Sequence, residues 1–193
     1  MEECIQLPQP QQGGGLSVLE AVWKRKSVRD FTPEDIDRQT LSNILWVAAG
    51  RNRRRGRTAP TTHNSQEIFT YVALKEGIYR YDPDAMTLTL GVEGDCRAAT
   101  GKQNFAGTAP LNLIYVADLS LIKGKEESEL VQAAHCDACF MAENVYLYCA
   151  SVGLGTVIRA MIDRKELSCM LGLPFGQMVT FAQSVGHIRK KEE

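Results

Sequence analysis

Apolar residues recur every three or four positions in four stretches of the chain, and this spacing predicts four helices. Ser17 followed by Glu20 forms a capping box at the start of the first helix. In the second stretch Thr32 is the predicted N-cap, Pro33 takes the first helical position and Gly50 ends the helix. The four predicted helices cover residues 16–26, 33–49, 129–151 and 163–172.

Other stretches are rich in β-branched and aromatic residues, which predicts strands. Residues 68–82 form a predicted hairpin that turns at Lys75–Gly77. Residues 111–118 are almost continuously apolar, as expected of a strand buried on both faces, and residues 178–186 supply the last strand. The mixture predicts an α+β fold with a largely antiparallel sheet flanked by helices.

The beginning of the chain has a different composition from the rest. Residues 1–15 are rich in Gln, Pro and Gly, which predicts a flexible N-terminal arm that is extended or disordered. Residues 16–193 are predicted to form a single domain, because no internal repeat or linker interrupts them and their number suffices for a full core.

Charge narrows the function mainly by exclusion. The chain has 22 Lys+Arg and 23 Asp+Glu, so its net charge of −1 gives no general attraction to nucleic acid or to a membrane surface. No apolar run approaches the ~20 residues of a membrane span, and no signal-peptide pattern begins the sequence. We therefore expect a cytoplasmic protein without nucleic-acid or membrane partners, and leave open a precursor segment that has been removed.

The six cysteines do not suggest a disulfide framework or a metal site. A domain of this size does not need disulfides, so we expect the cysteines to be reduced and mostly buried. Cys136 and Cys139 form a lone CxxC within an apolar helical pattern, without the second ligand pair that zinc requires. Core packing is the favoured interpretation of this pair, and no metal ligand is predicted.

Three polar segments are candidates for binding, and each has an alternative explanation. "RKSVR" (25–29) suggests an anion site, although basic residues also favour a helix end. "RNRRRGR" (51–57) suggests a phosphate or nucleic-acid patch, but a solvated loop is favoured because no aromatic residues are interleaved. "APTTHNSQEIF" (59–69) offers many amide and hydroxyl groups to a polar ligand, or forms an ordinary polar turn. "GLGTVI" (153–158) is interpreted as a helix end rather than a dinucleotide fingerprint.

The order of these segments resembles the FMN-dependent nitroreductase family over residues 17–188. "RKSVR" follows a first helix, "PTTHNSQ" precedes the hairpin, and "FAGTAPLNLIYVAD" leads into the central strand. "DACFMAENVYLYCASVGLGTV" then ends the long helix and "LGLPFGQMVTFAQSVGH" closes the core. The resemblance implies a nitroreductase-like fold that binds FMN at the interface of a homodimer.

The resemblance also implies roles for particular residues. The "RKSVR" segment would hold the FMN phosphate and the polar side of the flavin, helped by the basic pair near the C-terminus. The polar loop would reach the flavin of the partner subunit, residues 158–161 would run along the ring with a backbone amide near Ala160 facing N5, and Gln103 would contact the ribityl or pyrimidine edge. The implied cofactor-binding residues are Arg25, Lys26, Ser27, Arg29, Thr61, Thr62, Asn64, Gln103, Ile158, Arg159, Ala160, Arg189 and Lys190.

The chain departs from the family pattern in three places. Family members often have Pro-x-Glu-Gly where this chain has residues 158–161, so a glutamate side chain is lost and Arg159 becomes an unexpected charge beside the ring. Gln-Pro-Trp is common where this chain has Gln66-Glu67-Ile68. Many members also extend well past the last strand, whereas this sequence ends at "GHIRKKEE".

The implied reaction is a ping-pong transfer of two electrons from NAD(P)H through FMN to a small-molecule electron acceptor such as a nitro compound or a quinone. FMN N5 would carry the hydride, so no catalytic side chain is predicted. The alternatives are a flavin-dependent dehydrogenase acting on a small molecule or peptide, a flavin-binding sensor without turnover, and a nucleic-acid binder that uses residues 51–57.

Overall fold

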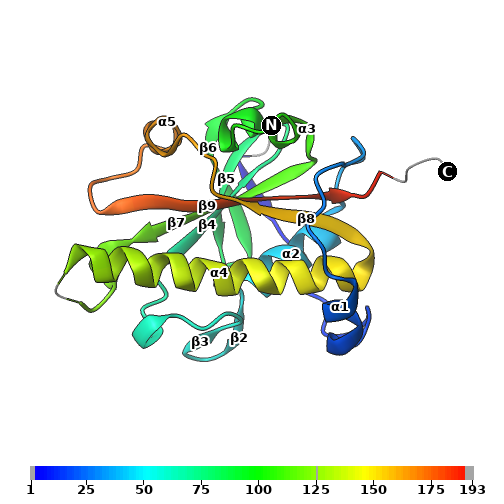
Figure 1. Ribbon diagram of the computed structural model, residues 1–193, viewed down its shortest axis with the longest axis horizontal. Coiled ribbons are helices and arrows are strands. Elements are labelled where there is room, and N and C mark those ends of the chain that lie inside the picture. Colours follow the sequence, from blue (N-terminus) through cyan, green and yellow to red (C-terminus); the bar gives the residue numbers. More distant parts are fainter. Residues whose placement is uncertain (1–2, 125, 190–193) are drawn as a thin grey trace.

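The computed structural model describes residues 3–124 and 126–189, and a seven-stranded antiparallel sheet forms its centre (Figure 1). The strands lie in the order β1-β6-β5-β4-β7-β9-β8. Helices cover both faces, which confirms the predicted α+β class. The strands are β1 (Cys4–Gln6), β4 (Ile68–Ala73), β5 (Gly77–Asp82), β6 (Thr87–Glu93), β7 (Leu111–Asp118), β8 (Leu154–Arg159) and β9 (Gln177–His187), and β2 (Arg51–Arg53) pairs with β3 (Gly56–Arg57) in a separate hairpin.

The central strands agree closely with the sequence prediction. β4 and β5 form the expected hairpin, closed where the Leu74 amide donates to the Gly77 carbonyl at 2.9 Å. β7 lies between β4 and β9, and its first seven residues are fully buried. A strand paired on both edges and covered on both faces favours apolar residues at nearly every position, which explains the absence of alternation, and the buried Asn112 side chain is hydrogen-bonded.

Two helices, α2 and α4, cover one face of the sheet, and α5 covers part of the other (Figure 1). Ile44 and Val145 join the larger core on the α2 and α4 side, whereas Leu167 of α5 packs with Ile114 and Val179 on the opposite face. The helices are α1 (Val18–Lys24), α2 (Arg38–Ala49), α3 (Phe105–Thr108), α4 (Glu127–Val152) and α5 (Arg164–Met170), with single turns η1 (Thr62–Asn64), η2 (Arg97–Thr100) and η3 (Leu119–Leu121).

A buried chain of hydrogen bonds fixes α4 on the sheet. The Tyr115 hydroxyl of β7 donates to Gln183 Oε1 of β9 at 2.6 Å, and Gln183 Nε2 donates to the Ala142 carbonyl of α4 at 3.1 Å. Each polar group is thereby satisfied inside the core, so the chain sets the helix position without leaving a buried donor unpaired.

The start of α2 corrects one prediction. Thr32 and Pro33 do not open this helix; Asp37 is the N-cap, and its carboxylate accepts from the Gln39 and Thr40 amides. The Thr32 amide instead donates to the His187 carbonyl at 2.9 Å, which holds the chain extended beside the end of β9. The other predicted signals are present: the capping box of Ser17 and Glu20, and Gly50 at the C-cap of α2.

The described part of the N-terminal arm is packed against the rest of the domain. β1 adds an edge strand to β6, and Leu7 is buried in the main core. The Pro8 carbonyl accepts from Ser42 Oγ at 2.6 Å, which ties the arm to α2. Leu7 supplies apolar burial and β1 supplies strand pairing, and these outweigh the flexible composition of the segment.

The cysteines are free, as expected, but most of them are not buried. Cys149 is the one fully buried cysteine, whereas Cys136 and Cys139 are exposed on the outer face of α4 beside Phe140. The helix turns Ala134 and Ala138 inward instead, so the core interpretation of the CxxC pair was wrong. Within residues 3–124 and 126–189 no helix could cross a membrane, and no three His, Cys, Asp or Glu side chains are grouped to hold a metal.

Candidate functional site

The basic segment after α1 runs along the outer edge of β8. The Val28 amide donates to the Thr156 carbonyl at 3.0 Å, and Ser27 forms a parallel bridge with Thr156. Phe31 then bridges to Ile188 at the end of β9. The segment therefore behaves as a short extra strand beside the edge of the sheet.

An extended segment sends successive side chains to opposite sides. On one side Arg25 lies over the Tyr146 ring at 5.4 Å, and Ser27 Oγ is 2.9 Å from the Tyr146 hydroxyl. The opposite side carries Lys26 and Val28.

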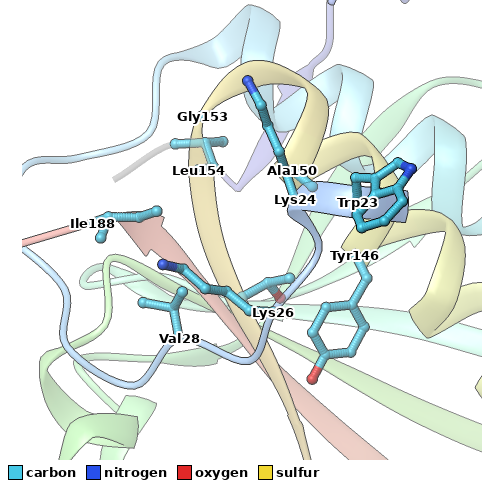
Figure 2. A pocket seen from close by; sticks show the side chains of 10 residues that line it. Trp23, Lys24, Lys26, Val28, Tyr146, Ala150, Gly153, Leu154 and Ile188 are labelled. Atoms are coloured by element: carbon cyan, nitrogen blue, oxygen red, sulfur yellow. The ribbon is translucent and has the colours of Figure 1, made fainter. Parts of the chain in front are cut away.

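Lys26 and Val28 line a pocket of about 440 Å³ between the segment, the end of α4 and the start of β8 (Figure 2). Figure 2 shows the Lys26 side chain running past Val28, with Trp23 on the far side of the pocket. Tyr146 borders both sides of the segment, because its ring also lines this pocket.

The cations of this segment lack carboxylate partners. Among the described residues, the Arg25 guanidinium makes a cation–π contact with the Tyr146 ring but no ion pair, and the side chains of Lys26 and Arg29 make no hydrogen bond or ion pair. Arg189, by contrast, donates to Asp30 at 3.0 Å and to the Phe31 carbonyl at 2.9 Å, which fastens the end of β9 to the segment. Lys190, the other member of the predicted basic pair, lies outside the described residues.

The outward-facing backbone groups of β8 alternate along its free edge. The Thr156 carbonyl accepts from the Val28 amide, and the Ile158 amide donates to the Tyr146 hydroxyl at 3.0 Å, the same hydroxyl that is hydrogen-bonded to Ser27 Oγ. Ala160 is the next outward position and is exposed. Its amide donates to no acceptor in the part of the chain that the structure describes, so this edge offers one free donor.

Arg159 does not present an exposed charge beside that edge. Its side chain turns inward and is only 2% exposed, because strand alternation sends it to the side opposite Ile158. Its guanidinium donates to the Thr100 carbonyl at 2.6 Å, to Asn112 Oδ1 at 2.8 Å and to Ser184 Oγ at 3.2 Å. Burial lowers the pKa of Arg159 to about 10, so it remains protonated at neutral pH.

Gln103 lies in the loop that packs against residues 159–162. The Lys102 amide donates to the Met161 carbonyl at 2.9 Å, which holds this loop beside the end of β8. Gln103 Oε1 is buried and has no hydrogen-bond partner among the described residues. A buried acceptor without a donor is costly unless a ligand or water supplies one.

The polar loop at residues 61–66 is ordered, but it lies elsewhere on the chain. The Thr62 amide donates to Asp137 of α4 at 2.7 Å, and Asn64 Nδ2 donates to the Arg55 carbonyl at 3.1 Å. Thr61 Oγ1 accepts from the Gln66 amide at 3.0 Å. Asp137 precedes Tyr146 by nine residues, or ~14 Å along the helix, so one chain does not bring this loop to Arg25.

A buried acid beside this loop was not predicted. Glu67 is fully buried and accepts from Ser65 Oγ at 2.6 Å, while its Oε1 has no partner in the described region. Burial raises the pKa of Glu67, and the nearby carboxylate of Asp137 raises it further. The departure from Gln-Pro-Trp at residues 66–68 was the sequence signal for this site, because it puts a carboxyl at the start of a buried strand.

The arginine-rich segment 51–57 is mostly used for structure. Arg51 pairs with Asp84, and Arg57 donates to the Ala49 carbonyl at 2.8 Å. Arg53 donates to the Arg57 carbonyl at 3.2 Å within the β2–β3 hairpin. These contacts favour the solvated-loop interpretation over a nucleic-acid patch.

Comparison with known proteins identifies what this arrangement is similar to. The model of the nitroreductase family matches residues 22–187. A curated protein of Methanocaldococcus jannaschii, named "Putative nitroreductase MJ1384", is 28% identical over 195 residues, covering 91% of this chain and 96% of its own. The crystal structure of a "putative nitroreductase" from Ralstonia eutropha JMP134 has 38% identity and a TM-score of 0.91, covering 98% of this chain and 91% of that one. A "Putative NADH Oxidase" from Clostridium acetobutylicum, 23% identical, shares the fold with a TM-score of 0.63 over 91% of this chain and 90% of that one.

Proposed function

The chain belongs to the nitroreductase family, and from that membership we propose that it is an FMN-dependent oxidoreductase. It takes two electrons from NADH or NADPH and passes them to a small-molecule acceptor such as a nitro compound or a quinone. The observation that carries this proposal is the row of unpaired cations at residues 25–29, which lies along β8, the strand that is followed by the free amide of Ala160.

The chemistry of these groups fits FMN. Arg25 and Arg29 are guanidinium donors of the kind that binds phosphate oxygens, and Ser27 adds a hydroxyl between them. Directly after β8, the Ala160 amide can donate to the flavin ring. Gln103 Oε1, which has no partner among the described residues, can accept from a ring N–H. An anionic tail and an amide-like ring edge would therefore both find complementary groups.

Each residue in this proposal binds or orients the cofactor. Bound FMN would supply the two-electron chemistry between nicotinamide and acceptor. Tyr146 orients Ser27 through its hydroxyl and supports Arg25 through its ring. The Ile158 amide is already occupied by Tyr146, so Ala160 is the donor left for the ring. Arg189 braces the segment through Asp30.

The proposed assembly is a homodimer. α1 exposes Leu19, Val22 and Trp23, the last of them 89% exposed, and Phe140 projects from the outer face of α4. Large apolar side chains grouped on two packed helices are typical of a surface that another chain covers. A second copy would also bring its own residues 61–66 to the cofactor.

Arg25→Ala tests the phosphate assignment. The variant should bind FMN about ten- to a hundredfold more weakly, corresponding to a charge-assisted hydrogen bond of ~1.5–3 kcal/mol, while riboflavin binding stays the same. Fluorescence titration of apo-protein measures both ligands. Arg54→Ala, which removes an equal charge from the β2–β3 turn, is the control. Equal weakening of FMN and riboflavin by Arg25→Ala would reject the assignment.

Turnover is tested separately by anaerobic reduction. Addition of NADH or NADPH should bleach the flavin absorbance, and a quinone or nitro compound should restore it. A flavin that binds tightly but is reduced by neither nicotinamide would contradict the oxidoreductase proposal and favour a sensor.

A further inference from the structure

Arg159 carries a charge that the surrounding protein does not neutralise. All of its hydrogen-bond acceptors are neutral: the Thr100 carbonyl and hydroxyl, Asn112 Oδ1 and Ser184 Oγ. No carboxylate in the described residues pairs with it. Removing an ion from water costs several kcal/mol. The buried acceptors need a donor, but a neutral N–H group could satisfy neutral acceptors without that cost, so stability alone gives no reason for a charge here.

The position of this cation connects it to the candidate cofactor site. Arg159 directly precedes Ala160, whose amide is the free donor at the edge of β8. The Thr100–Gln103 loop closes over the guanidinium, and a Cβ on Gly101 would overlap the Arg159 Nη1 nitrogen, so glycine permits this close approach. The same hypothetical Cβ is 3.4 Å from Gln103 Oε1, the orphaned acceptor.

The surroundings let the charge act at a distance. Neutral acceptors satisfy the N–H groups but leave the net positive charge in place. Charges interact more strongly in the protein interior than in water, and a buried charge is screened little by salt. A negative charge that develops beside Ala160 would therefore be stabilised by Arg159 without touching it.

We propose that Arg159 is an internal cation that stabilises the negatively charged reduced flavin; this rests on the proposed function. Oxidation of NAD(P)H to NAD(P)⁺ delivers two electrons and one proton to the ring, which gains one negative charge unless a second proton follows. Arg159 favours the singly protonated, anionic product. It is a positioning residue rather than a catalytic one, because its buried guanidinium cannot contact the substrate.

The test measures the midpoint potential of bound FMN by anaerobic equilibration with a reference dye. Arg159→Gln removes the charge and keeps N–H donors, and Arg159→Met removes both. Both variants should bind reduced flavin about tenfold more weakly relative to oxidised flavin, which lowers the two-electron potential by ~30 mV. Arg159→Lys should retain the wild-type potential. Arg164→Met is the control, since Arg164 also donates to backbone carbonyls, those of Val179 and Thr180 on β9, which lie past the last β8–β9 pair at Arg159 and Ala182.

The pH dependence of the potential gives a second readout. Wild-type potential should change by ~30 mV per pH unit, as expected for one proton per two electrons, and the neutral variants should move toward two protons. Unchanged potentials and slopes in variants that bind FMN would overturn the inference and leave the proposed function standing. Failure of the wild type to bind FMN would overturn both the inference and the proposed function. If both neutral variants unfold, the charge of Arg159 serves stability, and the inference alone is overturned.

Discussion

At the scale of single residues, Glu67 replaces the proline of the common Gln-Pro-Trp segment, and this change buries a carboxyl group. Its carboxyl is fully buried next to Asp137, which holds the polar loop through the Thr62 amide and hydroxyl. Two ionised carboxylates that are buried next to each other would repel, so the neutral form of Glu67 is favoured. The protonation of Glu67 therefore bears on the anchoring of residues 61–66.

Stability should decrease with rising pH because of Glu67. Its folded pKa is raised above the ordinary value of 4.5, so its contribution is fully present below that value and is lost as pH rises through the raised pKa. In this window a single linked proton lowers the free energy of unfolding by about 1.4 kcal/mol per pH unit. Glu67→Gln should remove this slope, as measured by urea unfolding at several pH values. Glu143→Gln, on the exposed face of α4, is the control, and identical slopes in all three proteins would contradict the assignment.

The sequence showed where polar and charged residues lie along the chain, but it did not show which way their side chains point. The alternating spacing in residues 25–29 is visible in the sequence, and the structure places Arg25 and Ser27 on the same side of the segment, against Tyr146. The inward turn of Arg159 could not be predicted, because it depends on which face of β8 its register assigns to the core. Cys136 and Cys139 were misplaced for a similar reason, since a helix with small inward residues hides which side faces solvent.

At the scale of elements, the start of α2 shows how local signals compete. Thr32-Pro33 and Asp37 both match an N-cap pattern, and tertiary contacts decide between them. Phe31 and Thr32 are drawn into pairing with the end of β9, so the helix begins at the second signal. The hairpin at β4–β5 and the central β7 had no such competitor and were predicted correctly.

The two candidate caps should therefore respond differently to mutation. Asp37→Ala removes the acceptor for two helix amides and should lower the free energy of unfolding by ~1 kcal/mol. Thr32→Val should cost nothing or stabilise, because the Thr32 hydroxyl is buried without a partner among described residues. Urea unfolding measures both. A larger loss of unfolding free energy from Thr32→Val than from Asp37→Ala would indicate that Thr32 is the N-cap.

At the scale of the whole molecule, one chain separates two groups that the proposed function needs together. Arg25 lies against Tyr146 near the C-terminal end of α4, whereas Thr62 is bound to Asp137 about 14 Å earlier along that helix. Both groups are held on α4, so within one chain the loop and the cations lie apart. The exposed apolar side chains of α1 and α4 lie along the same helix pair, so a second chain that covers them can supply the missing loop.

Mixed dimers test this sharing directly. Arg25→Ala removes a phosphate contact, and Asn64→Gly removes the loop side chain while suiting the positive φ of 54° at that position. Each homodimer should bind FMN weakly at both sites. If each site combines Arg25 of one chain with Asn64 of the other, a mixed dimer has one site with both defects and one with neither. Titration should then show tight binding at one FMN per mixed dimer, although both parents bind weakly. A monomer that binds one FMN tightly in sedimentation, or a mixture that recovers no tight site, would reject the shared site.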